Sequence, residues 1–469
     1  MRRGSTAEHH GSIRSCARHR TLLVCALLIP GYAVARASAE QDSLAVDENA
    51  LFADTQSVVS AAGLVDSGAA TGDMSERKSV GLSGEVTALA AGSLRRDWFL
   101  ENQRRSDAVL AGQVVANLML DARLPRGIKA FANAEANVSG ADSSGTMQAE
   151  FTVRELFVDA NIARHVYFRA GKQVLQWGRC FFWNPTDLIN VERKPFIDKI
   201  GYREGALGLR MHVPFGTRAN LYGFADLHDL RSIDSLAGAG KAEVLLGGVE
   251  MALSAWGKRG HKPVIGFDMS FPLFGAVGSL EASATDGANY PTVAVDRDGY
   301  LAIKDRSGTW YPRIALGILA ILDFLGVDDR LNLGAEFYFN GAAHSSTLLT
   351  DTRRYPLRPA FPGDTTVVEL NKGEFFFAQG LYEENSNAMG YAALFSSVKD
   401  FIVSDLTLDI NAIVNVNDWS AVTTAALTYT TLHNLSVGLS LNAFFGPDRA
   451  EYTLRGDGLV GRLSVGLLF

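Results

Sequence analysis

Polar and apolar residues alternate at a period of two along much of the chain, and the segment 459–469 shows this pattern most clearly. One face of the segment is apolar and consists of Leu459, Gly461, Leu463, Val465, Leu467 and Phe469. The opposite face is mixed and carries Arg462. Such an alternation predicts a β-strand with one apolar face. Because terminal residues usually fray into water, a strand that reaches Phe469 favours a paired end, either the closing strand of a barrel or the edge strand of a soluble sandwich.

The same alternation predicts further strands throughout the chain. They cover residues 79–90, 110–120, 128–138, 147–162, 165–178, 207–213, 219–227, 245–253, 264–284, 314–324, 331–339, 389–395, 406–414, 421–429 and 435–445. The strand 147–162 changes phase near Arg154 and Glu155, which predicts a β-bulge that keeps its polar residues on one side. We interpret 264–284 as one long strand with a bulge at Pro272.

With that interpretation the chain has about sixteen strands, and fourteen to eighteen are compatible with the pattern because strand boundaries are hard to place. Every long connection then lies on one side of the membrane, and both termini of the barrel chain lie on the other side. Short periplasmic turns opposite longer outer loops are typical of bacterial barrels. The long connections are 179–204, 285–310 and 342–386.

The character of the strands favours an all-β fold, an antiparallel transmembrane β-barrel. In 128–138 one face is aliphatic and the other carries Lys129 and Glu135, and no nearby segment has the pattern of a helix that covers an aliphatic face. Hydrophobic residues make up 47% and charged residues 20% of the 469 residues, values that a barrel reaches because each strand is half polar. The apolar run Ile314–Leu322 is too short for a membrane helix, which needs about 20 residues.

The N-terminal region is typical of a secretory signal peptide. Several arginines precede the apolar run Leu22–Pro30, and Ala37-Ser38-Ala39 supplies a cleavage site of small residues. We therefore expect a signal peptide at 1–39 and the outer-membrane β-barrel at 78–469. Between them, 40–77 is an N-terminal extension, either a disordered tail or a small plug.

Charge and cysteine content restrict the partners. The chain has a formal net charge of −7, and removal of the Arg-rich residues 1–39 makes the exported part more acidic. An acidic chain does not attract nucleic acid, so we expect no nucleic-acid partner. Of the three cysteines only Cys180 lies beyond the signal peptide, so no intramolecular disulfide is expected.

One internal motif stands out from the strand pattern. It comprises Arg169-Ala-Gly-Lys-Gln173, Trp177-Gly178 and Asn184-Pro185-Thr-Asp187. It resembles a family of porin-like bacterial outer-membrane proteins, in which a strand R-x-G-[RK]-Q-x-x-x-W-G leads into a loop that contains N-P-x-D. The resemblance is confined to this stretch and implies an outer-membrane β-barrel more than any substrate. Phe469 resembles the terminal residue of such barrels, which implies that the barrel assembly machinery recognises the last strand.

The residues that follow the motif predict a constriction of a pore. Three consecutive aromatic residues, 181–183, would be costly on a water-exposed loop, so we expect 179–204 to fold inward and narrow the lumen. In this hypothesis three positive residues, Arg169, Arg193 and Lys194, face Asp187 or Asp198. In the alternative, Trp177, Asn184 and Asp187 only anchor the turn of the loop. The expected pore-lining or constriction residues are Lys129, Glu135, Arg169, Gln173, Trp177, Asp187, Arg193, Lys194, Arg210, Glu336 and Arg462, and the expected loop anchors are Asn184 and Pro185.

These features predict a channel for passive diffusion of small hydrophilic solutes across a bacterial outer membrane, with membrane lipid as a partner. Two other classes remain open: a surface adhesin or receptor that displays 342–386, and a soluble secreted β protein. We expect no enzyme, because no histidine forms a catalytic pattern with Ser, Asp or Glu. No His/Cys spacing indicates a metal, and no cofactor is expected. Ion selectivity does not follow from the sequence, and both a monomer and a homo-oligomer are compatible with it.

Overall fold

The computed structural model describes residues 79–95, 109–141, 147–175, 177–189, 205–227, 236–259, 261–344, 347–358, 368–383, 385–430, 434–454 and 456–469. The chain divides into two compact units, Met1–Val46 and Asp47–Phe469, and every element below belongs to the second. The expected signal peptide 1–39 and extension 40–77 lie outside the described residues, as do Arg193 and Lys194.

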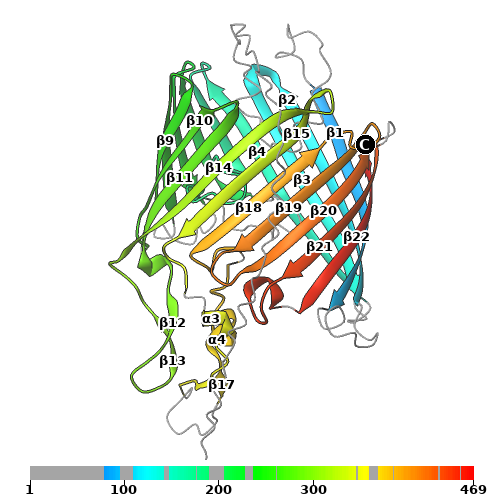
Figure 1. Ribbon diagram of the computed structural model, residues 1–469. Coiled ribbons are helices and arrows are strands. Elements are labelled where there is room, and N and C mark those ends of the chain that lie inside the picture. Colours follow the sequence, from blue (N-terminus) through cyan, green and yellow to red (C-terminus); the bar gives the residue numbers. More distant parts are fainter. Residues whose placement is uncertain are drawn as a thin grey trace, which may run out of the picture. The chain divides into compact units, whose positions relative to one another are not determined.

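Within the described residues, eighteen antiparallel strands form one sheet in which each strand pairs with the next along the chain. The first strand, β1 (Ser79–Arg95), also pairs with the last, β22 (Asp457–Leu468), so the sheet closes into a barrel (Figure 1). The backbone of Phe469 extends this pairing through two hydrogen bonds with Gly84, of 2.8 and 2.9 Å. The other strands are β2 (Val109–Leu124), β3 (Ile128–Ala141), β4 (Met147–Ile162), β5 (Val166–Gln173), β6 (Ala206–Phe215), β7 (Ala219–Asp226), β8 (Ala237–Leu246), β9 (Val249–Lys258), β10 (Val264–Leu273), β11 (Ala276–Asp286), β14 (Trp310–Phe324), β15 (Val327–Asn340), β18 (Gly390–Val398), β19 (Leu406–Asn415), β20 (Ser420–Thr430) and β21 (Leu435–Phe445).

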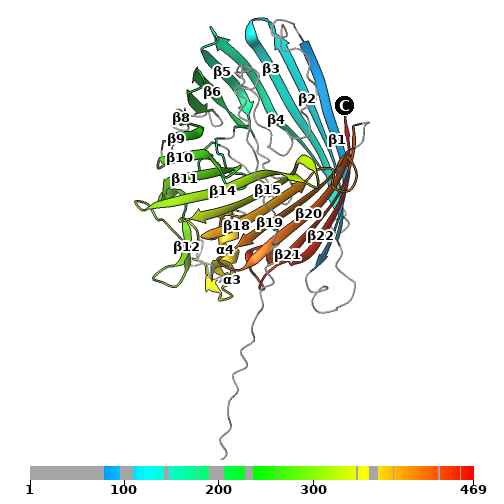
Figure 2. The same ribbon diagram turned by 45° about the horizontal axis from the view of Figure 1, so that its top comes forward.

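Short turns and longer connections alternate around the barrel. Short turns and the C-terminus lie at one end, and the longer connections at the other carry β12, α3 and α4 (Figures 1 and 2). In the described part of the chain, no helix has the length and apolar character to cross a bilayer. The short elements are η1 (Pro125–Gly127), η3 (Gly287–Asn289), β12 (Thr292–Val295), β13 (Leu301–Lys304), α3 (Thr347–Thr350), β16 (Tyr355–Pro356), β17 (Glu369–Leu370), α4 (Lys372–Ala378) and η4 (Glu451–Thr453).

The eighteen strands lie at the upper limit of the expected range, because two segments read as single strands are hairpins. The expected bulge at Pro272 is wrong: Pro272 pairs with Val277 across a turn, and β10 and β11 are separate strands. Likewise, the expected strand 245–253 is divided by a turn at Gly247 and Gly248, whose φ values are 59° and 85°. Each hairpin that was read as one strand adds one reversal of the chain direction. Because there are two such hairpins, the reversals cancel, and the long connections lie on the expected side.

The expected bulge in β4 is confirmed. Asn133 of β3 pairs with Glu155, and the next residue, Ala134, pairs with Val153. Arg154 is therefore the extra residue of a β-bulge. The bulge explains how polar residues on even positions before it and on odd positions after it share the inner face of the barrel.

The outer face of the barrel is apolar and exposed, whereas the inner face holds the buried charges. Large exposed apolar side chains include Leu82, Leu118, Phe151, Leu209, Leu253, Ile265, Leu316, Leu394, Leu439 and Val465. Charged residues that are buried include Glu135, Asp159, Arg169, Lys241, Asp268, Glu281 and Glu336. An apolar surface that surrounds a whole barrel is stable in lipid and not in water. The fold is therefore a transmembrane antiparallel β-barrel.

Candidate functional site

The segment 177–189, which follows β5, crosses the interior of the barrel, and we term it the lumenal loop. Its backbone amides donate hydrogen bonds to Glu281 of β11 and to Glu336 of β15. Several strands separate β5 from β11 and β15 along the sheet. Both glutamates are buried at inward positions. The loop is therefore held against a wall of the barrel that lies far from the strand where it begins.

Glu281 accepts four hydrogen bonds from the lumenal loop. The amides of Arg179 and Cys180 donate to Oε1 at 2.5 and 2.6 Å. The amide and the hydroxyl of Thr186 donate to Oε2 at 3.1 and 2.7 Å. One carboxylate thus joins both ends of the chain reversal 179–186 to β11.

Glu336 holds the middle of the same reversal. Its carboxylate accepts from three consecutive amides, those of Phe181, Phe182 and Trp183, at 2.7, 3.1 and 2.6 Å. Because successive amides seldom point to one place, this arrangement fixes the backbone conformation of the loop as well as its position. Glu336 was expected to line the pore, and the structure places its carboxylate against the loop.

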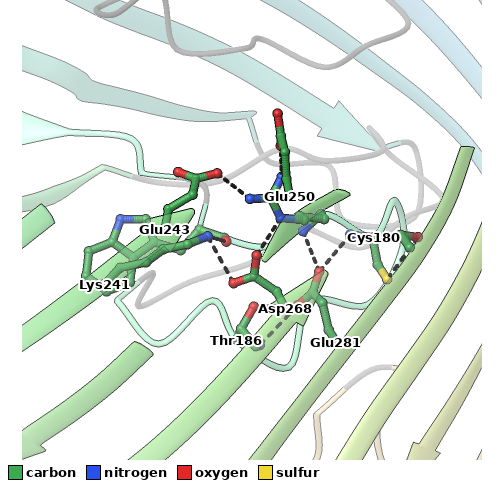
Figure 3. A network of polar contacts seen from close by, with 10 residues as sticks. Cys180, Thr186, Lys241, Glu243, Glu250, Asp268 and Glu281 are labelled. Atoms are coloured by element: carbon green, nitrogen blue, oxygen red, sulfur yellow. Dashed lines mark hydrogen bonds and ion pairs between the residues drawn. The ribbon is translucent and has the colours of Figure 1, made fainter. Parts of the chain in front are cut away.

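The side chain of Arg179 connects the loop to three further strands. Its Nε donates to Asp268 of β10 at 2.5 Å, and its terminal nitrogens contact Glu250 of β9 and Glu243 of β8. Burial opposes the charge of Arg179, but these carboxylates raise its pKa above the ordinary value. Lys241 also reaches Asp268, at 3.0 Å. Figure 3 shows Glu243, Glu250 and Asp268 gathered beside Lys241 and Glu281.

The three aromatic residues of the loop pack on aromatic residues of the wall. The Phe181 ring stacks on Phe395 with centroids 4.4 Å apart, and Trp183 stacks on Tyr338 at 5.5 Å. Phe182 is buried in the same cluster. Burying aromatic rings this way contributes favourable contact and removes them from water. This packing accounts for a run of aromatic residues in a connection.

The residues of the internal motif shape the wall beside β5 and the turn of the lumenal loop. Arg169 forms a two-point ion pair with Asp159, at 2.7 and 3.1 Å, and its guanidinium lies 3.8 Å from the Phe157 ring centroid. Asp187 is buried in the turn of the loop, Asp198 lies outside the described residues, and the facing of Arg169 toward either of them stays a prediction. A Cβ at Gly178 would lie 2.2 Å from Oδ1 of Asn184, so only glycine allows the loop to close there.

The remaining expected site residues are distributed around the lumen. Glu135 pairs with Arg154 at 2.6 Å, and Lys129 with Asp121 at 3.2 Å. Gln173 is buried and donates to the Arg169 and Gly208 carbonyls, and Trp177 is buried with its carbonyl bonded to Lys241. Residues Asn184 to Asp187 form a turn. Arg210 lies on β6 and Arg462 on β22.

Sequence reasoning missed four of the acidic partners of the loop. Glu243, Glu250, Asp268 and Glu281 each occupy an inward position of a strand with apolar outward neighbours. That alternation was the available signal for Asp268 and Glu281, and the reading of β10 and β11 as one bulged strand obscured it. No local pattern indicates that Arg179 is the residue on which three of these carboxylates converge.

Replacement of Glu281 by Ala should expose Cys180. The change leaves the Arg179, Cys180 and Thr186 donors without their acceptor, and each buried unpaired donor costs about 1–3 kcal/mol. In the native barrel Cys180 is buried, and this burial raises the pKa of its thiol, so it should react slowly with iodoacetamide. We expect severalfold faster alkylation in Glu281→Ala, measured by mass spectrometry on the folded barrel without residues 1–39. Glu281→Gln, which retains one acceptor oxygen, should be intermediate, and equal rates in all three proteins would contradict the anchoring role.

A second connection, between β21 and β22, also turns inward. Glu451 of η4 accepts hydrogen bonds from the Tyr391 hydroxyl at 2.7 Å and from the side chains of Asn387 and Asn415 at 3.1 and 2.8 Å. Its neighbour Tyr452 donates to the side chain of Asn385. These contacts join the connection to β18, β19 and the connection before β18.

The lumenal loop and the η4 connection meet at Asn385. The Trp183 indole donates to the backbone carbonyl of Asn385 at 2.9 Å. The side chain of Asn385 accepts a hydrogen bond from the Tyr452 hydroxyl. Three connections of the barrel are therefore joined by one continuous set of buried hydrogen bonds. Fully bonded buried networks of this kind make a structure rigid.

The stability of this network should depend on pH through Glu451. Burial raises the pKa of Glu451 to about 7, although its three side-chain hydrogen bonds oppose the rise. Because the pKa of Glu451 is raised in the folded state, its contribution to the free energy of unfolding is fully present below the ordinary value of 4.5. That contribution is lost as pH rises through about 7. We expect the detergent-solubilised barrel to unfold at a higher temperature at pH 5 than at pH 8, and Glu451→Gln to reduce this difference. An unchanged difference in Glu451→Gln would assign the pH dependence to other groups.

Comparison with known proteins places the fold but no residue role. No protein-family model and no curated protein matches the sequence. Among solved structures, OccK5 (OpdH) of Pseudomonas aeruginosa superposes with a TM-score of 0.50 at 9% identity, over 83% of this chain and 98% of that chain. The fold is that of a porin-like barrel. OccAB1 of Acinetobacter baumannii gives a TM-score of 0.48 at 10% identity, over 83% of this chain and 96% of that chain.

Proposed function

We propose that this chain is a bacterial outer-membrane channel through which small hydrophilic solutes diffuse passively, and that the lumenal loop forms its constriction. The main support is the loop itself, which crosses the barrel interior and is bonded to Glu281 and Glu336. Barrels of sixteen to eighteen strands leave an aqueous channel. A loop held at fixed points inside such a channel narrows it and determines which solutes pass.

In this proposal the solute passes between the loop and the charged inner wall. Glu250 has a side chain that is 47% exposed, more than the other carboxylates around Arg179, so a solute meets it first. Arg169 and Gln173 support the wall beside the loop, and Asn184 and Pro185 shape its turn. The proposed lining residues are Lys129, Glu135, Trp177, Asp187, Arg210, Arg462 and, where the loop continues, Arg193 and Lys194.

We also propose how the protein is exported to the outer membrane and what surrounds it there. Residues 1–39 direct export, 40–77 form an extension, and the barrel assembly machinery recognises the last strand through Phe469. Outer-membrane lipid surrounds the apolar face, and the barrel acts as a monomer or a homo-oligomer without enzymatic activity. The motif from Arg169 to Asp187 supports membership of the porin-like family that it resembles.

Liposome swelling tests the channel directly. Proteoliposomes with the folded barrel should swell in isotonic solutions of small sugars and amino acids and should not swell in solutions of a large dextran. Liposomes without protein and liposomes with heat-denatured protein serve as controls. An absence of swelling with every small solute would contradict a channel.

A second candidate function, a surface receptor or adhesin, is supported by a separate observation. The connections before β14 and before β18 fold together on a small apolar core that contains Val293, Leu301, Leu348, Phe375 and Phe376. A folded outer unit is a suitable surface for a partner. In that case the barrel would serve as a scaffold, and the same liposomes would show no swelling.

A further inference from the structure

The hairpin of β14 and β15 extends beyond its neighbours at the end of the barrel that carries the short turns and the C-terminus (Figure 1). On one side, the pairing of β14 with β11 ends at Ala320. On the other side, the pairing of β15 with β18 begins at Leu331. All residues from 321 to 329 are exposed. The sheet therefore ends here in a projecting hairpin, 321–330, which we term the rim hairpin.

The two edges of the rim hairpin differ. The β15 edge is covered by the next connection, because the Lys399 amide donates to the Arg330 carbonyl at 3.0 Å and Nε of Arg330 donates to the Lys399 carbonyl at 2.9 Å. The β14 edge lacks such a cover: in the described part of the chain, no backbone hydrogen bond joins 321–324 to a strand other than β15. A strand edge of this kind presents amides and carbonyls with which another chain can pair.

The rim hairpin carries large apolar side chains although it lies in water. Its apolar residues, each at least 38% exposed, are Ile321, Leu322, Phe324, Leu325 and Val327. Asp323, Asp328 and Asp329 are interleaved with them and are exposed as well, and aspartate is unfavourable among acyl chains. The apolar side chains of the rim hairpin therefore meet water in the isolated barrel. Contiguous exposed apolar side chains mark an interaction surface.

Two neighbouring turns place a large apolar residue where the backbone favours a small or polar one. The turn between β10 and β11 is Phe274-Gly275, with φ values of 50° and 83°, and the turn of the rim hairpin is Leu325-Gly326, with 54° and 77°. Two-residue turns with positive φ at both positions favour Asn, Asp or Gly at the first. Phe274 is fully exposed and Leu325 is 75% exposed, so packing within the barrel does not explain either side chain. A strained conformation without such an explanation indicates a functional role.

We propose that the rim hairpin binds an extended basic segment of a periplasmic protein, which pairs with 321–324 of β14 as an added strand. Such a strand would lie directly beyond the turn that carries Phe274, because β11 and β14 are neighbours in the sheet. Main-chain hydrogen bonds supply affinity in this mode of recognition, and alternate side chains supply specificity. Apolar side chains of the segment would cover those of the rim hairpin.

The charge of the rim hairpin selects the kind of partner. Three of its residues are exposed aspartates, whereas its one arginine, Arg330, donates to the carbonyls of Lys399 and Asp400. A second copy of the barrel would bring the same aspartates to this edge, so charge complementarity favours a basic partner. Short turns face the periplasm in bacterial barrels, which makes the partner a periplasmic protein. The proposal is independent of whether the lumen conducts.

Binding of a synthetic peptide to the detergent-solubilised chain from residue 40 onward tests the proposal. The probe is a fluorescent peptide of alternating lysine and valine, and its binding is followed by anisotropy. One comparison peptide has glutamate in place of lysine, and another keeps the lysines but has proline in place of valine, which prevents strand pairing. We expect the lysine–valine peptide to bind severalfold more tightly than both. Equal binding of either comparison peptide would overturn the proposal.

Phe274→Asn/Leu325→Asn removes both apolar tips and gives both turns their preferred residue. Affinity for the lysine–valine peptide should fall severalfold, while the unfolding temperature stays the same or rises, since Asn-Gly suits these turns. Asp328→Asn/Asp329→Asn should reduce the preference for the lysine–valine peptide over the glutamate peptide. Unchanged affinity in the first variant would overturn the proposal, as would a lower unfolding temperature, which would make the two side chains structural.

Leu246→Asn is the matched control. Leu246 is 61% exposed beside the Gly247-Gly248 turn of β8 and β9, several strands away from β14 along the sheet. This variant should bind the lysine–valine peptide like the native barrel, and an equal loss of affinity here would overturn the assignment to the rim hairpin. A native dimer that Phe274→Asn/Leu325→Asn loses, with no peptide bound, would assign the surface to a second copy instead.

Discussion

Deletion of residues 181–199 is expected to raise the single-channel conductance of the barrel in planar bilayers about twofold or more, because an unobstructed barrel of this size is a wide aqueous pore. The narrowest section of a pore dominates its resistance. In the native barrel the aromatic residues of the loop fill lumenal space beside β15 and β18, where Phe181 stacks on Phe395 and Trp183 on Tyr338. Without them that section is open. Unchanged conductance would contradict a constriction formed by this loop.

The control for the deletion is a Gly/Ser linker of equal length in place of 181–199. Such a linker keeps the chain length but loses the aromatic packing and Thr186, which donates to Glu281. If the fixed position of the loop matters, conductance should rise here as well and fluctuate more. Both variants must show the heat-dependent gel mobility of a folded barrel, so that a change in conductance is not a failure of folding. Low conductance in the linker variant alone would indicate that chain bulk is sufficient to narrow the pore.

Val465→Arg is expected to impair assembly of the barrel severely, whereas Ser464→Arg is expected to be tolerated. Val465 is 42% exposed on the outer face, opposite Val437 of β21 and Ala88 of β1. An arginine on the lipid face costs about 2–4 kcal/mol at the middle of the bilayer. Ser464 is the adjacent residue and points to the opposite side of the strand, where water in the lumen can solvate a charge.

The two arginine variants form a matched pair, since the same side chain is added to neighbouring residues of β22. The measurement is the fraction of folded protein in membranes, read from heat-dependent mobility in detergent gels. Val465→Arg should give little folded protein, and Ser464→Arg about as much as the native chain. If both variants assembled equally well, the assignment of the two faces of β22 would be wrong.

The same local alternation accounts for most of the fold that could be predicted. It placed Val465 and Arg462 on opposite faces, and it located the bulge at Arg154. Both predictions need only the alternation of polar and apolar residues within one strand. It failed where a turn interrupts an apolar run. Val244 to Met251 stays apolar through Gly247 and Gly248 with one charge, Glu250, so the hairpin left too small a break in the pattern to be seen.

The site was predictable only in part, for a related reason. The aromatic run 181–183 indicated an inward loop because exposed aromatic residues are unfavourable, which is a property of the residues themselves. The partners of that loop are set by distance in space. Glu281 binds the amide of Arg179 from 102 residues away in the sequence, and Arg169 pairs with Asp159 because the register of β4 and β5 sets the two residues directly opposite.

The sequence by itself therefore determined which face of each recognised strand meets lipid, since that choice depends on the side-chain alternation of a single strand. The tertiary structure decided how many strands close the barrel, where the lumenal loop is bonded, and which carboxylates surround Arg179. These features depend on strand register and on the path of the loop across the lumen. They are fixed by contacts between residues far apart in the chain, and no period within one strand encodes them.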